Sequence, residues 1–217
     1  MIILAGDTST SINTVAVCEN GKTLAETVVE CGKSHAERLV ETIDWVLGEA
    51  GISLGDVDAL AVSTGPGSFT GLRVGLATWK GLALGQGFPL AGVPTLAAMS
   101  RIPGRNEGLL CPVLDARMGE VFAAAFRFDS GRREQVLPEC VAPVEVVAEK
   151  LAGESPTMFG DGVGVYEDRI RECIPSARFL PRMLWAPRAS AVAAEAADML
   201  RAGYSVDAAS VRPVYLR

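Results

Sequence analysis

The segment Ser63-Thr-Gly-Pro-Gly-Ser-Phe-Thr-Gly-Leu-Arg-Val-Gly75 constrains the fold of this chain more than any other part of its sequence. It follows an apolar run at 57–62 that predicts a buried strand, and it leads into 72–84, which has the apolar spacing of a helix. Gly65, Gly67 and Gly71 leave the backbone without Cβ atoms, so it can adopt positive φ and approach another group closely. The sequence therefore predicts a strand, a glycine loop and a helix N-terminus in succession.

Such a loop has two interpretations. The unpaired N–H groups and the dipole of a helix N-terminus together favour an anion, so the loop is a candidate phosphate site. Strand-to-helix turns also use glycine for geometry alone. The spacing is not GxGxxG, because Thr70 stands where the third glycine would be, and no Gly-Lys-Ser/Thr of a P-loop follows. Spacing alone leaves both interpretations open.

The first part of the chain alternates strand and helix patterns. Apolar runs predict its strands, at 2–6, 14–18, 23–29, 57–62 and 90–93. Asn20-Gly21 between two of these runs is a strong hairpin signal. Ser34 and Glu37 form the capping-box pattern of a helix start, and apolar residues then recur at helical spacing until Gly51.

The polar segment 102–108, with its proline and two glycines, is the best candidate boundary. We therefore expect an N-terminal subdomain at 1–103, which carries the glycine loop, and a C-terminal subdomain at 104–217. Strand and helix patterns resume beyond the boundary, at 109–115, 120–128, 143–151, 157–160 and 189–202. The last of these is an Ala-rich helix that is expected to pack back on the first subdomain. No element is assigned to 128–141, which is rich in charge and turn residues.

Composition and charge exclude several classes of protein. No apolar run reaches the length of a transmembrane helix, and the first strand pattern lacks the basic region of a signal peptide, so we expect a cytoplasmic protein with no membrane partner. Five scattered cysteines contain no CxxC pair, which disfavours a zinc site or a disulfide framework. The net charge of −6 makes the chain a poor nucleic-acid binder by itself, because such affinity depends on Lys and Arg contacts to phosphates.

Four segments of the sequence occur in the order typical of one known family. They are Asp7-Thr8-Ser9, the GPGSFTGLRVG string at 65–75, Asp115-Ala-Arg-Met-Gly-Glu-Val121 and Pro213-Val-Tyr-Leu-Arg217. In these segments and in length the chain resembles the TsaB (YeaZ) family. That family is the bacterial partner subunit in the synthesis of N6-threonylcarbamoyladenosine in tRNA. The resemblance covers nearly the whole chain, and the glycine string is its specific part.

Both halves of the sequence place a strand, an aspartate-containing turn and a second strand in the same order, around Asp7 and Asp115. This indicates an internal duplication, and a coincidence of two hairpins is the alternative. The TsaB family has the actin/Hsp70/sugar-kinase (ASKHA) fold, an α/β fold of two similar subdomains with mixed sheets. The resemblance therefore implies that fold here.

In that superfamily a nucleotide lies between the halves and the two turns hold its phosphates. The positions that correspond in this chain are Asp7, Thr8, Ser9, Gly65, Gly67 and Asp115. The Asp-Thr-Ser turn also has an explanation without a ligand, because such side chains commonly bond to their own local backbone.

His35 is the only histidine in the sequence, and it lies in the first turn of an expected helix. Histidine is the natural general base near neutral pH, but a partly exposed helix residue is the simpler interpretation. A zinc protease of the HExxH type is excluded because no second histidine exists. A serine hydrolase is disfavoured by the lack of a G-x-S-x-G elbow.

The resemblance also predicts what the chain lacks. The catalytic paralogue, the TsaD subunit, carries an HxxxH metal pair beyond the strand that follows the shared glycine loop and helix. Thr95 and Met99 occupy those places here, and they are not a plausible pair of metal ligands. We therefore expect no catalytic residue, no metal and no cofactor required by this chain. ATP or ADP is expected only at an interface with the catalytic partner.

Two helices are expected to form a partner surface. Residues 69–86 contain glycines at four-residue spacing, and interior glycines cost roughly 1 kcal/mol each relative to alanine, which close packing of another backbone would explain. That backbone belongs either to the chain's own sheet or to a partner. In the TsaB family the two N-terminal helices form a bundle used for self-association or for pairing with TsaD. The positions carried over are His35, Arg38, Leu39, Thr42, Gly71, Leu72, Gly75, Leu76 and Trp79.

The leading hypothesis is a non-catalytic subunit that pairs with and supports TsaD in modifying position 37 of tRNA. The TsaE ATPase would bind the assembled pair, the homodimer would use the same helices, and tRNA would be contacted only through the complex. The alternative is a stand-alone ATP-dependent enzyme of the sugar-kinase type, which the glycine loop and the paired aspartate turns favour. A glycoprotease-type metallopeptidase is disfavoured by the single histidine.

Overall fold

The computed structural model describes residues 1–31, 35–104, 107–204 and 207–216, without the side chains of 35–37. The predicted capping box of Ser34 and Glu37 lies outside the described residues. The chain forms two compact units, unit 1 from Met1–Ala98 with Pro187–Tyr215, and unit 2 from Met99–Ala186 with Leu216. The division predicted from the sequence lay after residue 103, whereas the chain leaves unit 1 at Ala98 and returns to it at Pro187.

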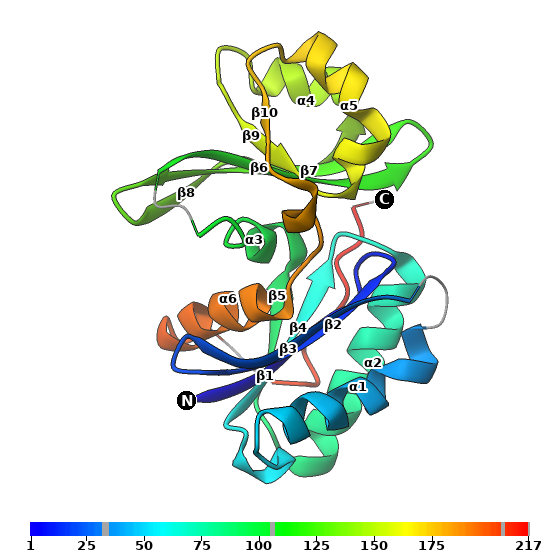
Figure 1. Ribbon diagram of the computed structural model, residues 1–217, viewed down its shortest axis with the longest axis vertical. Coiled ribbons are helices and arrows are strands. Elements are labelled where there is room, and N and C mark those ends of the chain that lie inside the picture. Colours follow the sequence, from blue (N-terminus) through cyan, green and yellow to red (C-terminus); the bar gives the residue numbers. More distant parts are fainter. Residues whose placement is uncertain (32–34, 105–106, 205–206, 217) are drawn as a thin grey trace. The chain divides into compact units, whose positions relative to one another are not determined.

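Unit 1 is a five-stranded mixed sheet with helices on both faces (Figure 1). Its elements are β1 (Ile2–Asp7), β2 (Ile12–Glu19), β3 (Lys22–Glu30), α1 (His35–Glu49), β4 (Ala59–Gly65), α2 (Phe69–Gln86), β5 (Leu90–Pro94) and α6 (Ala189–Arg201), with α3 (Thr95–Met99) at the boundary between the units. The strand order is β3-β2-β1-β4-β5, in which the first three strands are antiparallel and β4 and β5 run parallel to β1.

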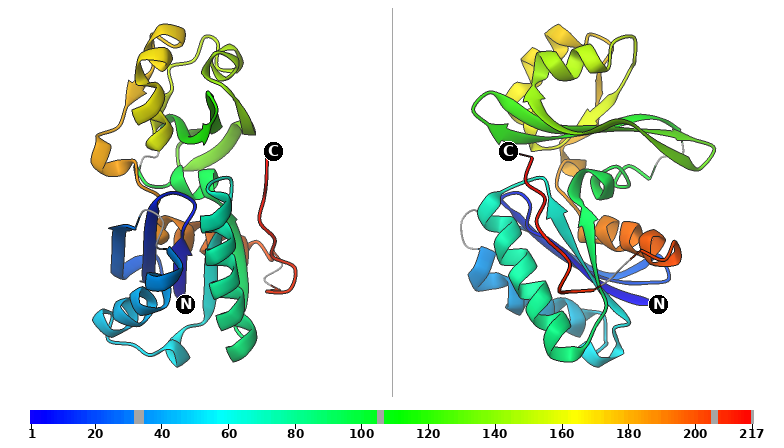
Figure 2. Two further views of the ribbon diagram at one scale, coloured as in Figure 1. Left: turned by 90° about the vertical axis from the view of Figure 1, so that its right-hand side faces the viewer. Right: turned by 180° about the vertical axis from the view of Figure 1, so that it is seen from behind.

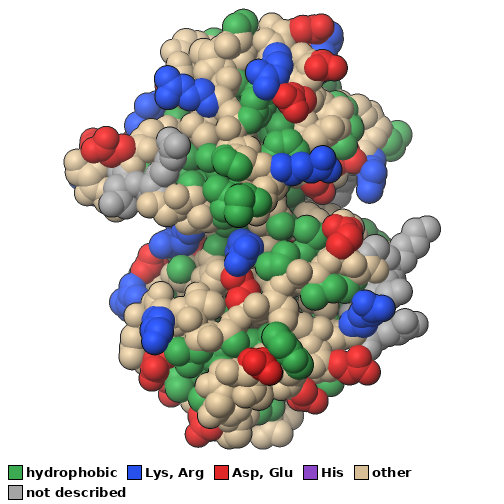
Figure 3. Space-filling model, in the orientation of Figure 1, with side chains coloured by type: hydrophobic (Ala, Val, Ile, Leu, Met, Phe, Trp, Pro, Cys, Tyr) green, Lys and Arg blue, Asp and Glu red, His purple; other side chains and the backbone are tan. Residues whose placement is uncertain are grey.

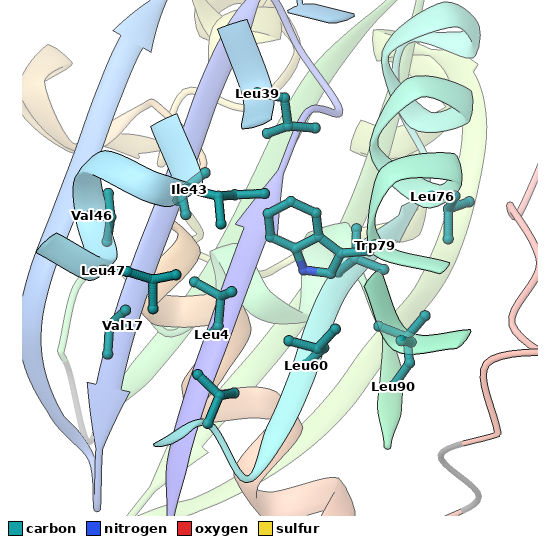
Figure 4. Packing of buried hydrophobic residues seen from close by; sticks show 14 of the residues in the cluster. Leu4, Val17, Leu39, Ile43, Val46, Leu47, Leu60, Leu76, Trp79 and Leu90 are labelled. Carbon is teal, nitrogen blue, oxygen red and sulfur yellow. The ribbon is translucent and has the colours of Figure 1, made fainter. Parts of the chain in front are cut away.

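The two faces of this sheet are packed differently. Helix α6 covers one face with alanines, which pack on alanines of the strands and allow a close approach. Helices α1 and α2 cover the other face through larger side chains, with Trp79 of α2 fully buried among them (Figure 4). The Trp79 indole lies against Gly6, where a Cβ atom would be 2.6 Å from the ring, and its N–H donates to the carbonyl of Ala61. Gly6 is therefore required for the tryptophan to fit.

Unit 2 is a second five-stranded mixed sheet. Its elements are β6 (Gly108–Arg117), β7 (Glu120–Asp129), β8 (Arg132–Pro143), α4 (Val144–Lys150), β9 (Thr157–Phe159), α5 (Asp161–Cys173) and β10 (Arg178–Phe179). The strand order is β10-β9-β6-β7-β8, with α4 and α5 packed on the apolar core of the sheet. Both units thus consist of three antiparallel strands followed by two parallel ones, so the repeated order seen in the sequence corresponds to a repeated topology.

Three elements of unit 2 were missing from the sequence prediction, namely β8, α5 and the two-residue strand β10. Most of the segment 128–141, to which no element was assigned, lies in the long edge strand β8 (Arg132–Pro143). Helix α5 was not predicted, because its glycines and charged residues hide the helical pattern and its backbone departs from helical geometry at Tyr166. None of the described helices combines the length and the hydropathy needed to cross a membrane.

Candidate functional site

The Asp7-Thr8-Ser9 turn lies at the end of β1, and its three residues are buried. One carboxylate oxygen of Asp7 accepts the backbone N–H and the hydroxyl of Ser9, each at 2.8 Å. This is an Asx turn, in which the side chain shapes its own backbone. The local explanation left open by the sequence is therefore realised in the structure.

Thr8 fixes this turn to helix α2. Its hydroxyl donates to the carbonyl of Gly71 at 2.7 Å, inside the buried part of unit 1. A Cβ atom on Gly71 would collide with the Thr8 carbonyl, and one on Gly75 would collide with the Thr8 hydroxyl. Two of the glycines at four-residue spacing are thus explained by close approach of the chain's own β1–β2 turn.

The glycine loop is bound to the same turn. Ser68 donates its backbone N–H to the Ser9 carbonyl at 2.6 Å, and its hydroxyl caps helix α2 by accepting the N–H of Gly71 at 3.2 Å. Gly67 has a φ of 158° and packs directly on Ser9. Two amide donors that could have faced an anion are therefore used within unit 1.

Gly65, at the start of the loop, has a φ of 115° and lies against the C-terminal segment, where a Cβ atom would be 2.6 Å from the carbonyl oxygen of Val214. Its N–H donates to the hydroxyl of Thr95 at 3.2 Å. Thr95 is fully buried, and so is Met99 at the other end of α3. The two residues that the resemblance aligns with the paralogue's metal pair are thus buried, and Thr95 supports the glycine loop.

The Asp115 turn of unit 2 is tied together in a similar way. Asp115 accepts the backbone N–H of Arg117 at 2.8 Å and the hydroxyl of Tyr166 at 3.3 Å, and it pairs with the Arg117 guanidinium at 3.0 Å. Arg117 and Met118 have φ values of 66° and 56°, which non-glycine residues rarely adopt. The turn is therefore held in a strained shape by its aspartate.

The sequence analysis missed a second strand–glycine–helix turn, Gly160-Asp161-Gly162, which joins β9 to α5. A Cβ atom on either glycine would collide with the backbone of β6, so the turn packs as closely as the glycine loop of unit 1. Asp161 accepts the N–H of Asp115 at 3.0 Å. Burial raises the pKa of the Asp161 carboxyl, and the neighbouring Asp115 carboxylate raises it further. A glycine pair directly after an apolar run was the signal available in the sequence.

Most residues proposed for the partner interface are buried within unit 1 and are not on its surface. Side chains of the buried core account for four of them, namely Leu39, Leu72, Leu76 and Trp79. Thr8 fills the space beside Gly71 and Gly75. Arg38 is exposed, and Thr42 is half-buried and donates to the Arg38 carbonyl at 2.7 Å. The side chain of His35 lies outside the described part of the chain.

Other residues of the two helices provide an exposed apolar surface. Val40 and Trp45 of α1 are 55% and 54% exposed, and Leu84 of α2 is 66% exposed. Gly81 and Gly85 of α2 have no atom within 4 Å of the position that a Cβ would take. Figure 3 shows hydrophobic side chains beside acidic ones on the side of unit 1 that carries α1. We call Val40, Trp45, Gly81, Leu84 and Gly85 the outer surface of the helix pair.

Comparison with known proteins places the chain in a family. A family model described as TsaD, tRNA N6-adenosine threonylcarbamoyltransferase, matches residues 29–217. A relative from Escherichia coli (strain K12), named tRNA threonylcarbamoyladenosine biosynthesis protein TsaB, is 36% identical over all of this chain and 95% of its own length. The chain belongs to the TsaB family. Another relative of that name, from Haemophilus influenzae, is 30% identical over all of this TsaB-family chain and 94% of its own.

Solved structures agree with this assignment. The structure of YeaZ from Pseudomonas aeruginosa superposes with a TM-score of 0.86 at 30% identity, and 99% of each chain is covered. Component A of the (R)-2-hydroxyglutaryl-CoA dehydratase from Acidaminococcus fermentans gives a TM-score of 0.53 at 11% identity, covering 93% of this chain and 99% of that one. The second likeness concerns the fold alone. The family and the ASKHA fold predicted from the sequence are both confirmed.

Proposed function

We propose that this chain is a non-catalytic subunit in the synthesis of N6-threonylcarbamoyladenosine at position 37 of tRNA, and that it pairs with and supports the catalytic TsaD subunit. Full-length membership of the TsaB family supports the general role. One structural observation supports the non-catalytic role. Thr95 and Met99, which the resemblance aligns with the metal pair of the catalytic paralogue, are both buried.

The potential metal ligands in the rest of the described chain are also consistent with a non-catalytic role. Among the described residues, no group of three or more His, Cys, Asp or Glu side chains lies close enough together to hold a metal ion. The turn of Asp7 and the glycine loop use their polar groups on each other, as described above. A chain built in this way is suited to supporting a partner, and we propose that it requires no cofactor of its own. Any ATP or ADP would bind where the catalytic subunit contributes the remaining contacts.

The outer surface of the helix pair is the proposed docking surface. Trp45 and Leu84 expose large apolar areas on neighbouring helices. Tryptophan is among the residues that contribute most to binding energy at interfaces, and exposed apolar patches mark interaction sites. Gly81 and Gly85 each cost the helix roughly 1 kcal/mol relative to alanine, and nothing within the described chain packs on them. A second backbone that approaches closely there would offset this cost.

One docking surface cannot serve two partners at once. A homodimer through the helix pair would therefore compete with the pair formed with TsaD, and the homodimer would be a storage form. The TsaE ATPase would bind the assembled pair. With a net charge of −6 the chain would contact tRNA only through the complex.

The test is co-purification of the chain with the TsaD subunit of its organism, followed by sedimentation with and without ATP. We expect a one-to-one pair that displaces the homodimer. Trp45→Glu and Leu84→Glu should abolish both assemblies, because they place a charge in an apolar contact. Val165→Glu is the matched control, since Val165 is 57% exposed on α5 of unit 2.

Two outcomes contradict the proposal. If the wild-type chain does not pair with TsaD and hydrolyses ATP by itself, the sugar-kinase-like alternative is favoured instead. If pairing survives both helix-pair variants but is lost in the Val165 control, the subunit role stands and the docking surface is misassigned.

A further inference from the structure

The C-terminal segment 211–215 runs beside helix α2 and is bonded to it (Figure 2). The N–H of Val214 donates to the carbonyl of Thr64 on β4 at 2.8 Å. The regular β4–β5 pairing breaks at this point, where β5 ends in Pro94, which has no N–H to donate. The Lys80 ammonium of α2 donates to the carbonyl of Val211 at 3.1 Å. The segment is therefore part of unit 1, and it completes the end of strand β4.

Tyr215 brings this segment to the first turns of α2. Its ring lies 5.2 Å from the ring of Phe69, centre to centre, and its hydroxyl accepts the Nε–H of Arg73 at 3.0 Å. The Arg73 guanidinium also lies over the Phe69 ring, 3.7 Å from its centre. Phe69 and Arg73 are four residues apart on one helix face, so both side chains can contact Tyr215. We call Phe69, Arg73 and Tyr215 the arginine clamp.

The clamp leaves the outer edge of the guanidinium available. Within the described part of the chain, Arg73 forms no ion pair, and its side-chain hydrogen bond is the one through Nε. Phe69 and Tyr215 are 53% and 41% exposed, so the clamp stands on the surface of unit 1. A guanidinium presents its remaining N–H groups as a planar fork that matches a carboxylate. Stacking and the Tyr215 bond hold the fork in place, which lowers the entropy lost on binding.

The surroundings favour a carboxylate of a protein over a phosphate ligand. Phosphate groups of nucleic acids are bound by several cations together, but the one other cation of α2, Lys80, is half-buried and donates to the carbonyl of Val211. Exposed aromatic rings flank the guanidinium, and aromatic residues and arginine are the side chains enriched in protein interfaces. The clamp also lies on α2, the helix that contributes Gly81 and Leu84 to the proposed docking surface.

We infer that Arg73 is an anchor for a carboxylate of the protein partner, and that Tyr215 is the positioning residue that holds it. This inference rests on the proposed function, because it assigns a specific contact to the proposed pairing. It makes the C-terminal segment a part of the docking surface.

The clamp is tested first in the isolated chain. In an NMR spectrum of the arginine side chains, the Arg73 Nε–H should exchange slowly with solvent in the wild type and rapidly in Tyr215→Phe, which keeps the ring and removes the acceptor. Equal exchange in the two proteins would overturn the positioning role of Tyr215. If inorganic phosphate or ATP at about 1 mM shifts this resonance, the edge binds phosphate and the inference is wrong.

The anchor is tested on the pair with the catalytic subunit, by the dissociation constant at low and high salt. Arg73→Gln should weaken pairing about tenfold to a hundredfold and reduce its salt dependence. Arg73→Lys should weaken it almost as much, because a lysine cannot form the planar fork. Tyr215→Phe should show a smaller loss. Arg201→Gln is the matched control, since Arg201 is an exposed cation of α6 on the other face of the sheet.

The two proposals can fail separately. If Trp45→Glu abolishes pairing while Arg73→Gln pairs within twofold of the wild type, the docking surface stands and the anchor is wrong. If the wild-type chain does not pair at all, the proposed function and the anchor both fall, whereas the exchange measurement still decides whether the clamp exists.

Discussion

The carboxylate of Glu26 on strand β3 binds Ser190 in the first turn of helix α6, although 164 residues separate them in the sequence. Glu26 accepts the backbone N–H and the hydroxyl of Ser190, each at 2.9 Å, and it also accepts two hydrogen bonds from the Arg188 guanidinium. A residue of the sheet thus serves as the N-terminal cap of the helix that covers the sheet. The carboxylate also lies at the positive end of the helix dipole.

Glu26→Gln should lower the free energy of unfolding by about 1 to 3 kcal/mol, because the charge is lost and one oxygen that accepts two hydrogen bonds is replaced by an amide nitrogen that cannot accept. Urea unfolding at fixed protein concentration measures this. Glu30→Gln, an exposed glutamate at the end of the same strand, is the control and should change stability by less than about 0.5 kcal/mol. Equal effects of the two substitutions would show that the bonds of Glu26 do not stabilise the fold.

Gly75→Ala and Gly81→Ala should have opposite effects, although both glycines lie inside helix α2. A Cβ on Gly75 would collide with the Thr8 hydroxyl, so we expect a loss of about 1 to 3 kcal/mol. A Cβ on Gly81 meets open space, so the better helix propensity of alanine should add up to about 1 kcal/mol in the isolated chain. The two urea midpoints decide this, and a loss of stability in Gly81→Ala would contradict it.

Asn13→Leu should stabilise the protein. Asn13 is fully buried on β2, and among the residues that the structure describes neither polar atom of its side-chain amide has a hydrogen-bond partner. Replacing this buried, unpaired amide by an apolar side chain of similar volume should raise the free energy of unfolding by about 1 to 3 kcal/mol. Thr14→Val is the adjacent comparison and should destabilise, because the Thr14 hydroxyl accepts the N–H of Ala189 at 3.2 Å. Destabilisation by Asn13→Leu would show that the amide has a structural or binding role.

Cys111 should make the fold less stable at alkaline pH. Burial raises the pKa of its thiol to about 12 from the ordinary 9.0. Between these values the unfolded chain loses the proton and the folded chain keeps it, so stability is complete below pH 9 and falls as the pH rises. The slope attributable to this thiol is at most about 1.4 kcal/mol per pH unit. The free energy of unfolding, measured with urea from pH 8 to 10.5, should therefore fall more steeply with pH in the wild type than in Cys111→Ala. Parallel pH dependences in the two proteins would contradict this role of the thiol.

The glycines of α2 show which contacts could be predicted from the sequence and which could not. Their four-residue spacing predicted close approach of another backbone, which the structure shows at Gly71, against the Thr8 carbonyl, while Gly75 meets the Thr8 hydroxyl. It could not separate the pair Gly71 and Gly75, which the β1–β2 turn fills, from Gly81 and Gly85, which are open. Helical periodicity finds an apolar stripe but does not tell whether that stripe faces the chain's own sheet or a partner. The resemblance carried the family's helix interface onto Leu39, Leu72, Leu76 and Trp79, and the apolar pattern could not show that these side chains are buried in unit 1.

The two turns and the fold were easier to predict than the surface. Asp7 and Asp115 follow apolar strands directly, and local chemistry fixes what they do. Trp45 and Leu84 gave no comparable signal, because a single exposed apolar residue looks the same in the sequence as a buried one. The arginine clamp was hidden for another reason, since Arg73 and Tyr215 are 142 residues apart and only the folded chain brings them together.

Unit 1 is assembled from two stretches of chain separated by the whole of unit 2, and this has a consequence for synthesis. A ribosome that has released residues 1–98 has made all five strands of the sheet and the helices of one face. The alanines of the opposite face stay uncovered until α6 emerges, some ninety residues later. During that interval unit 2 can already fold. The last part of the chain therefore closes the first unit, and a nascent chain halted before residue 189 should depend on chaperones that bind exposed apolar sheets.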